Sequence, residues 1–165
     1  MKRSDKIIPD RISRGTVSVR ERLGFLDRTQ PHAVLATDAE GSPYTSLIAY
    51  ALTSDMEGLL FITPKSTRKY RNILKNNRVS LLIDTRSNTE KDYMGAESVT
   101  ILGKAGPVRK GRKWSELAGI LLAKHPVLRK VMLSPETALI MVDITKCIHV
   151  TNFQSVSTWD VETAK

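Results

Sequence analysis

The chain has 165 residues, which suits one globular domain, and it carries a formal net charge of +9. Hydrophobic residues make up 41% and charged residues 26%, and no apolar run approaches the ~20 residues needed to span a membrane. The single cysteine, Cys147, excludes an internal disulfide and a cysteine-based metal site, and the first residues lack the apolar stretch of a secretory signal. Both features predict a cytoplasmic protein.

The first part of the chain is expected to hold a short arm and a helix. Residues 1–15 are polar and show no periodicity, so they predict an N-terminal arm in front of one domain that spans residues 16–165. Ser18 and Glu21 have the spacing of a capping box, and apolar residues follow on one helical face. This pattern predicts a helix that begins near Ser18.

Short apolar runs separated by turn residues predict strands over much of the remaining sequence. The turns at 38–43 and 54–58 are short, so the first three strands are expected to form an antiparallel meander. Gly103 lies inside an expected strand and suggests a bulge or a close approach of another backbone. The expected strands cover residues 33–37, 44–53, 59–63, 79–83, 98–105 and 138–150.

Two further helical regions and one loop complete the prediction. Ser66 can cap a helix that runs to about Lys75, and a second helical region at 112–132 is broken or restarted by Pro126. Residues 85–95 are expected to form a polar loop. With six strands and three helices in all, the sequence predicts a mainly β (α+β) fold, in which six antiparallel strands close into a barrel with flanking helices.

The positive charge is concentrated in two segments. Residues 65–91 hold eight Lys or Arg against two Asp or Glu, and residues 104–130 hold eight against one. Such an excess attracts anions in general, including phosphorylated cofactors and nucleic acid, although it also suits a basic surface that serves only solubility. Nucleic acid is the least favoured of these partners, because only Tyr70 and Trp114 lie near the basic runs for base stacking.

A phosphate site is expected where the strand at 59–63 meets the following helix. Free backbone N–H groups and the positive end of a helix favour an anion at this position, and four polar side chains surround it. Hydroxyls of Ser66 and Thr67 can donate to phosphate oxygens, and Arg68 and Lys69 add charge-assisted hydrogen bonds. The segment lacks the glycines of a P-loop, so a nucleoside triphosphate is not implied. The alternative is a capped helix with a solvated basic face.

The order of these segments resembles the pyridoxamine 5'-phosphate oxidase-like family of FMN-binding split barrels. The similarity covers residues 16 to 161, and its pieces are specific through their order and spacing. The resemblance implies a split-barrel fold with FMN as cofactor. The matching stretches are residues 33–37, 41–47, 60–63, 69–81, 99–105 and 149–159.

The resemblance also implies roles for nine residues. Lys69 matches the phosphate-binding cation of the family, and its neighbours in the segment 66–68 would complete the phosphate shell. Thr63 lies where the third strand meets the cofactor. The other residues that match cofactor-contacting positions are Ser46, Leu47 and Ile48, in the strand whose backbone edges the isoalloxazine ring, and Trp159, which would reach the flavin of the second subunit of a homodimer. As an alternative, Trp159 fills a surface groove of its own chain.

Several functional alternatives stay open. The chain ends without the Arg-Leu-x-Pro type of substrate motif, so vitamin B6 oxidation is not expected, and an FMN-dependent oxidoreductase acting on another small molecule is favoured. The alternatives are a non-enzymatic FMN carrier or electron-transfer protein, and a deazaflavin- or heme-binding relative, the last suggested by His125-Pro126. The three histidines show no metal-ligand spacing, and no catalytic acid or base is identified.

Overall fold

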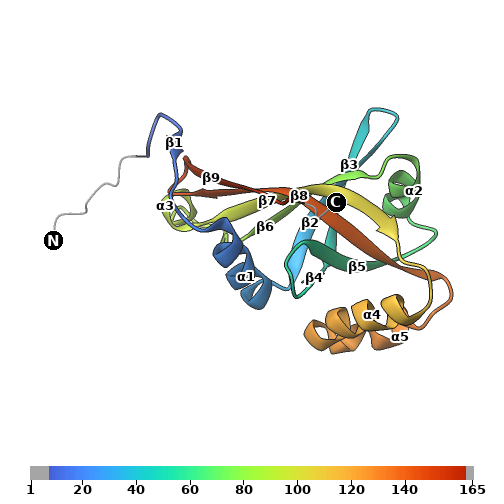
Figure 1. Ribbon diagram of the computed structural model, residues 1–165. Coiled ribbons are helices and arrows are strands. Elements are labelled where there is room, and N and C mark those ends of the chain that lie inside the picture. The colour runs from blue at the N-terminus through green and yellow to red at the C-terminus, as the bar shows by residue number, and fades with distance from the viewer. Residues whose placement is uncertain (1–7, 163–165) are drawn as a thin grey trace.

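A computed structural model describes residues 8–162 of the protein. A single mixed sheet dominates the fold, with helices on its flanks (Figure 1). The main path of the sheet runs β1-β9-β8-β7-β6-β2-β3, and β5 pairs with both β4 and β8. The nine strands are β1(Ser13–Arg14), β2(His32–Ala39), β3(Ser42–Ala49), β4(Ala51–Leu52), β5(Gly58–Pro64), β6(Arg78–Asp84), β7(Ser98–Pro107), β8(Thr137–Thr151) and β9(Ser155–Asp160).

The mainly β, α+β fold class is confirmed, whereas the six-stranded antiparallel barrel is not. The described part of the chain has nine strands, and β1 pairs with β9 in parallel. β3 and β5 form no ladder with each other. The strand between them in sequence, the two-residue β4, is the one that pairs with β5, so no β3–β5 ladder closes the sheet. The segment Ser13–Arg14, expected to be part of a free arm, forms β1, and residues 1–7 of that arm lie outside the described residues.

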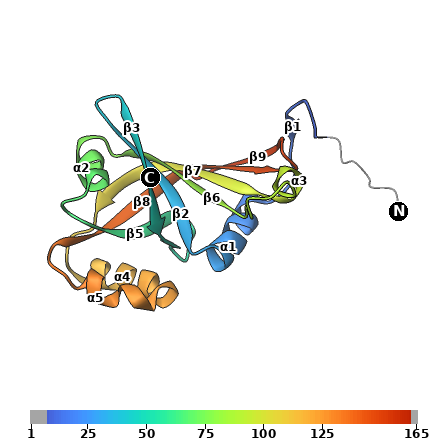
Figure 2. The ribbon, with the colours of Figure 1, turned by 180° about the vertical axis from the view of Figure 1, so that it is seen from behind.

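The helices lie at the edges of the sheet, as the two opposite views show (Figures 1 and 2). α1 is capped by Ser18, whose hydroxyl accepts a hydrogen bond from the Glu21 N–H at 3.4 Å, as the capping-box spacing predicts. None of the helices in residues 8–162 has the length and apolar character to cross a bilayer. The helices are α1(Val19–Thr29), α2(Arg68–Lys75), α3(Asp92–Gly95), α4(Arg112–Lys124), the 3-10 helix η1(Pro126–Leu128) and α5(Arg129–Met132).

Three features of the chain differ from the sequence prediction. The strand expected at 44–53 is interrupted at Tyr50, where β3 ends and β4 begins. The polar loop at 85–95 contains the single turn α3. The strand β9 was not predicted, because Ser155–Asp160 has weak alternation and pairs with β8 only after a turn in which Asn152 and Phe153 take positive φ angles.

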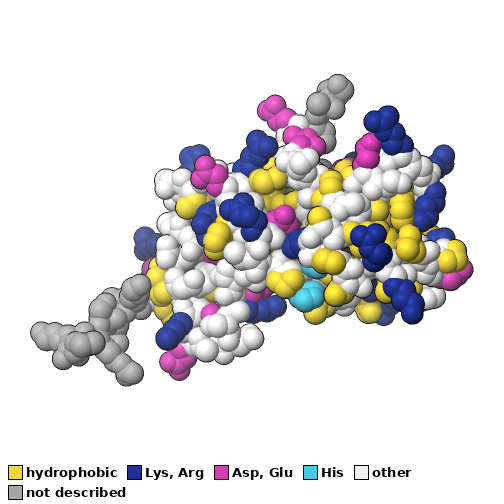
Figure 3. Space-filling model, turned by 90° about the horizontal axis from the view of Figure 1, so that it is seen from below, with side chains coloured by type: hydrophobic (Ala, Val, Ile, Leu, Met, Phe, Trp, Pro, Cys, Tyr) yellow, Lys and Arg dark blue, Asp and Glu magenta, His cyan; other side chains and the backbone are white. Residues whose placement is uncertain are grey.

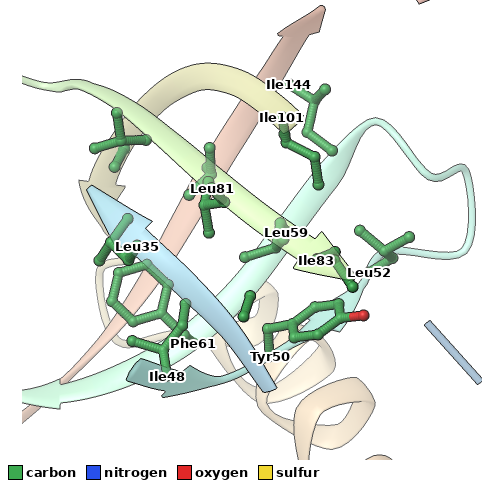
Figure 4. Packing of buried hydrophobic residues seen from close by; sticks show 14 of the residues in the cluster. Leu35, Ile48, Tyr50, Leu52, Leu59, Phe61, Leu81, Ile83, Ile101 and Ile144 are labelled. Carbon is green, nitrogen blue, oxygen red and sulfur yellow. The ribbon is translucent and has the colours of Figure 1, made fainter. Parts of the chain in front are cut away.

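The core lies between the curled sheet and α1. Phe61 and Leu59 of β5 face Leu35 of β2 and Leu81 of β6, and Tyr50 closes one end of the cluster (Figure 4). All five side chains are at most 1% exposed. The lone cysteine, Cys147 of β8, is fully buried in this core, and its burial raises the pKa of the thiol to about 12.

Gly103 produces the bulge that the sequence suggested. The β7–β8 register shifts between Leu102 and Gly103. A Cβ on Gly103 would lie 2.5 Å from the Asp143 carbonyl oxygen and 2.7 Å from Val142 Cγ1. Only glycine therefore allows the two backbones to come this close, which is the physical reason for its place inside a strand.

A second, smaller core supports α4 and α5 on the outer side of β5 and β8. Leu117 and Leu121 of α4 pack with Met132 of α5 against Leu60 and Leu139 of the sheet. The helix predicted at 112–132 is confirmed in position, and it restarts at Pro126 as expected. These two short helices form a separate layer below the sheet in the view of Figure 1.

Candidate functional site

The start of α2 follows directly on the end of β5, as the expected phosphate site requires. Thr67, rather than Ser66, is the N-cap, and its hydroxyl accepts a hydrogen bond from the Tyr70 N–H at 3.4 Å. The helix therefore begins at Arg68, one residue later than a Ser66 cap predicts. Ser66 is exposed just before the cap and accepts a hydrogen bond from the Arg71 guanidinium through its carbonyl.

The first turn of α2 presents donors and no acid. The N–H groups of Arg68 and Lys69 have no acceptor within the helix, because the carbonyls four residues before them lie outside it. They are therefore open to an external acceptor. The turn contains no Asp or Glu, and the side chains of Arg68 and Lys69 add two cations. The helix dipole and these cations both favour an anion at this end.

Two hydrogen bonds, one partly buried and one buried, hold this helix start against the sheet. Thr63, at the end of β5 and 1% exposed, shares a hydrogen bond of 2.8 Å with the Thr67 hydroxyl. Asn72 donates from Nδ2 to Thr37 Oγ1 of β2 at 3.0 Å, and both side chains are buried. Asn72 was not predicted as a site residue, and its only mark in the sequence is its spacing from Lys69.

The strand β3 runs beside this helix start, and Arg68 links the two. Its guanidinium donates to Ser42 Oγ at 3.2 Å and lies over the Tyr44 ring, with the Cζ atom 4.8 Å from the centroid. Within the described chain, the residues of β3 form a ladder only with β2. The other backbone edge of β3 therefore offers N–H and C=O groups to a ligand.

The three β3 residues predicted to border a cofactor differ in their surroundings. The Ser46 hydroxyl is buried and has no hydrogen-bond partner within the described residues. Leu47 is 67% exposed, whereas Ile48 is only 5% exposed and belongs to the core. The unpaired Ser46 hydroxyl can therefore hydrogen-bond a ligand, and Leu47 offers apolar surface. Only the backbone of Ile48 is available to a ligand.

Trp159 does not join the other predicted residues within one chain. It lies in β9, opposite Cys147 of β8, and packs partly buried against the core. The Arg20 guanidinium of α1 lies above its ring, with Cζ 5.9 Å from the centroid. The structure joins Thr63 to Thr67 and places Arg68 beside β3, whereas Trp159 lies in β9, which pairs with β1 and β8 and not with β3 or β5.

Two of the three histidines are buried against protein oxygen atoms, and the third is exposed. His125 is 8% exposed, and its Nε2 lies 2.8 Å from the Tyr50 carbonyl oxygen. His149 is 1% exposed, and its Nε2 lies 2.8 Å from Glu97 Oε2. His32 is exposed at the start of β2. The described residues contain no group of three His, Cys, Asp or Glu side chains that could hold a metal ion.

A charged network beneath α1 was missed by the sequence reasoning. Glu97, directly before β7, accepts hydrogen bonds from the Arg22 guanidinium of α1, one of them from Nε at 2.9 Å, and contacts His149. The Arg22 hydrogen bond, followed by that of His149, holds the pKa of Glu97 below its usual value despite partial burial. Nearby, Lys124 of α4 binds Asp27 of α1 at 2.8 Å, and desolvation lowers the pKa of this lysine.

The comparison with protein families identifies the chain. The family model described as pyridoxamine 5'-phosphate oxidase matches residues 21–151, which include β3, β5 and the whole of α2. The chain belongs to the pyridoxamine 5'-phosphate oxidase family. Curated proteins gave no match.

Solved structures in this family's fold are similar in shape and distant in sequence. A heme binding protein from Mycobacterium smegmatis has a TM-score of 0.77 and 16% identity over 88% of this chain, which spans 59% of that protein. A FAD-binding protein from Mesorhizobium loti has a TM-score of 0.64 and 19% identity, covering 81% of this chain and 94% of that one. General Stress Protein 26 from Bacillus anthracis has a TM-score of 0.67 and 14% identity, covering 88% and 100%. At such identities, the likeness extends to the fold alone.

Proposed function

We propose that this member of the pyridoxamine 5'-phosphate oxidase family binds FMN at the junction of β3, β5 and α2, and that it is a small-molecule oxidoreductase. The observation that carries the proposal is the acid-free start of α2, where two N–H groups are open, Arg68 and Lys69 supply two cations, and the Arg68 side chain reaches β3 beside its open edge. A phosphate and a flat ring system need such a combination: charge-assisted donors at one end and backbone groups at the other.

The residues present fit this cofactor. Ser66, Arg68 and Lys69 would hold the phosphate, while Thr67 caps the helix and fixes the direction of its N–H groups. The orphaned Ser46 hydroxyl and the backbone of its neighbours in β3 would bind the edge of the ring. When bound, FMN supplies hydride or electron transfer, and the chain supplies orientation and electrostatics.

Lys69→Ala tests the phosphate site directly. We expect this variant to bind FMN roughly tenfold to a hundredfold more weakly, because it loses a charge-assisted hydrogen bond worth about 1.5–3 kcal/mol. Titration of the apoprotein with FMN, followed by quenching of flavin fluorescence, measures the change. Lys75→Ala is the matched control: it removes a cation from the other end of the same helix, where Lys75 pairs with Glu40 at 2.9 Å. Equal affinity of the wild type and the Lys69 variant would refute the site.

We further propose a homodimer, because the cofactor surface of one chain is open and carries uncovered apolar area. Leu47, beside the proposed ring site, is 67% exposed. Leu47→Asp is expected to shift the protein from dimer to monomer in sedimentation velocity, while Val127→Asp, at an 86% exposed position on η1, leaves the dimer intact. In such a dimer, Trp159 would be free to meet the partner's flavin. A wild-type monomer would contradict this part of the proposal.

Heme is the second candidate, since relatives of the same fold are described as heme binding proteins. In this chain, however, His125 is occupied by the Tyr50 carbonyl, so the His125-Pro126 pattern gives heme no accessible ligand. Parallel titrations with FMN, a deazaflavin and hemin, each followed by absorbance, rank these cofactors. Turnover of NADH or NADPH by the flavin-loaded protein then separates an oxidoreductase from a carrier.

A further inference from the structure

A groove lies between α4 and α5, away from the proposed cofactor site. Its volume is about 400 Å³, and polar and apolar surface contribute about equally to its lining. Trp114 and Leu122 line it from α4, and Met132 and Leu133 line it from α5 and the residue that follows. Leu133, at the border of the groove, is 68% exposed, so the single chain leaves this apolar side chain uncovered.

More apolar surface continues from the groove along η1 and α5. Val127 is 86% exposed and Val131 is 45% exposed. The face of the molecule seen from below shows hydrophobic side chains among Lys and Arg in the region of these helices (Figure 3). Uncovered apolar area bordered by charged residues is typical of a surface that binds another macromolecule.

Gly119 indicates that the occupant of the groove comes close to α4. It lies in the middle of α4 and lines the groove, where a Cβ would meet no atom within 4 Å. Glycine is less favourable than alanine inside a helix, and nothing in the described chain requires it here. Ser115 and Ala123, one turn before and one turn after, also line the groove. This floor of small side chains would let the backbone of a second helix approach closely.

The charge around the groove selects among possible occupants. Residues 104–130 carry eight cations and one acid, and that acid, Glu116, is paired with Arg112 at 2.9 Å. Arg129 lines the groove itself, and the Lys110 ammonium lies 3.3 Å from the Trp114 ring centroid. A second copy of this chain would bring cations against cations, which opposes association. An acidic partner is complementary.

We propose that the α4–α5 groove is the docking site for an acidic amphipathic helix of a partner protein. Apolar residues on one face of that helix would contact Trp114, Leu122 and Leu133, and its carboxylates would pair with Arg129 and the neighbouring cations. The concave floor of small side chains favours a helix, which can lie in the groove, over a lipid surface, which would contact only exposed side chains at its rim such as Leu133.

Synthetic peptides test the proposal with the full chain. The probe is a fluorescently labelled helical peptide of about five turns (~18 residues), with leucines on one face and glutamates on the other. A second peptide carries lysine in place of each glutamate. We expect the fluorescence anisotropy of the acidic peptide to rise with protein concentration and to saturate, and the basic peptide to show no saturation. Added salt should weaken the acidic peptide's binding.

Gly119→Leu is the decisive variant, since it fills the groove with a residue that favours helix. It should weaken binding of the acidic peptide by roughly tenfold or more, while thermal unfolding shows that the fold is kept. Glu116→Leu, on the same helix but outside the groove lining, is the control and should bind at least as well as the wild type. Three results would each overturn the proposal: no binding of the acidic peptide, equal binding by Gly119→Leu, or wild-type self-association or vesicle binding that this variant abolishes.

Discussion

Gly103→Ala is expected to destabilise the protein by about 2–3 kcal/mol, one of the largest effects of any single methyl group in this chain. The added Cβ would lie 2.5 Å from the Asp143 carbonyl oxygen, which is backbone and cannot rotate away. The β7 and β8 strands would have to separate at the bulge, and that movement would disturb Val142 in the core. Urea unfolding followed by tryptophan fluorescence measures the change in the free energy of unfolding.

The control for this prediction lies three residues along the same strand. A Cβ on Gly106 would meet no atom within 4 Å. Gly106→Ala is therefore expected to change the free energy of unfolding by less than about 0.5 kcal/mol, or to raise it slightly by restricting the unfolded chain. Equal effects of the two substitutions would show that the steric explanation of the bulge is wrong.

Glu97→Ala is the second substitution for which we expect a large loss, about 2–4 kcal/mol at pH 7. Glu97 is only 12% exposed, and its removal leaves the 1% exposed His149 without the partner of its Nε2 atom. It also frees Arg22 of α1 from the sheet. Chemical unfolding at pH 7 provides the measurement, with Glu116→Ala as a control on an exposed carboxylate.

The same carboxylate gives the protein a pH dependence of defined sign. Arg22 and His149 lower the pKa of Glu97 in the folded state, so the folded protein binds fewer protons at this group than the unfolded chain does. Its stabilising contribution is therefore complete above the unfolded value of about 4.3 and is lost as the pH falls through the lower folded value. Glu97→Gln should flatten the fall in stability below about pH 4.5. An unchanged acid profile would contradict the assignment.

Local physics was sufficient to predict much of the fold. The Ser18 cap, the restart at Pro126 and the bulge at Gly103 each follow from a property of one residue type, and the structure confirms all three. The cationic start of α2 was also predictable, because Pro64 ends the strand and a Ser or Thr hydroxyl can cap the helix that follows. There the error was a shift of the cap from Ser66 to Thr67.

The features that were not predicted depend on contacts between distant segments. β9 becomes a strand because β8 is long enough to pair with it; its six residues include the strand formers Val156, Thr158 and Trp159 but do not alternate regularly. Tyr50 interrupts a run of good strand formers because its ring is buried and its carbonyl meets His125. No local pattern marks Glu97 and His149 as partners, since they meet only through the register of β7 and β8.

The ion pairs beneath α1 join residues that are synthesised far apart in time. Arg22 is synthesised 75 residues before its partner Glu97, and Asp27 is synthesised 97 residues before its partner Lys124. A nascent chain that ends before Glu97 lacks the ion-pair partner of Arg22, and one that ends before α4 lacks that of Asp27, although the Leu52 N–H can already reach the Asp27 carboxylate. The contacts of α1 with β8 and β9 form only after these strands are made, so we expect α1 to reach its native packing late.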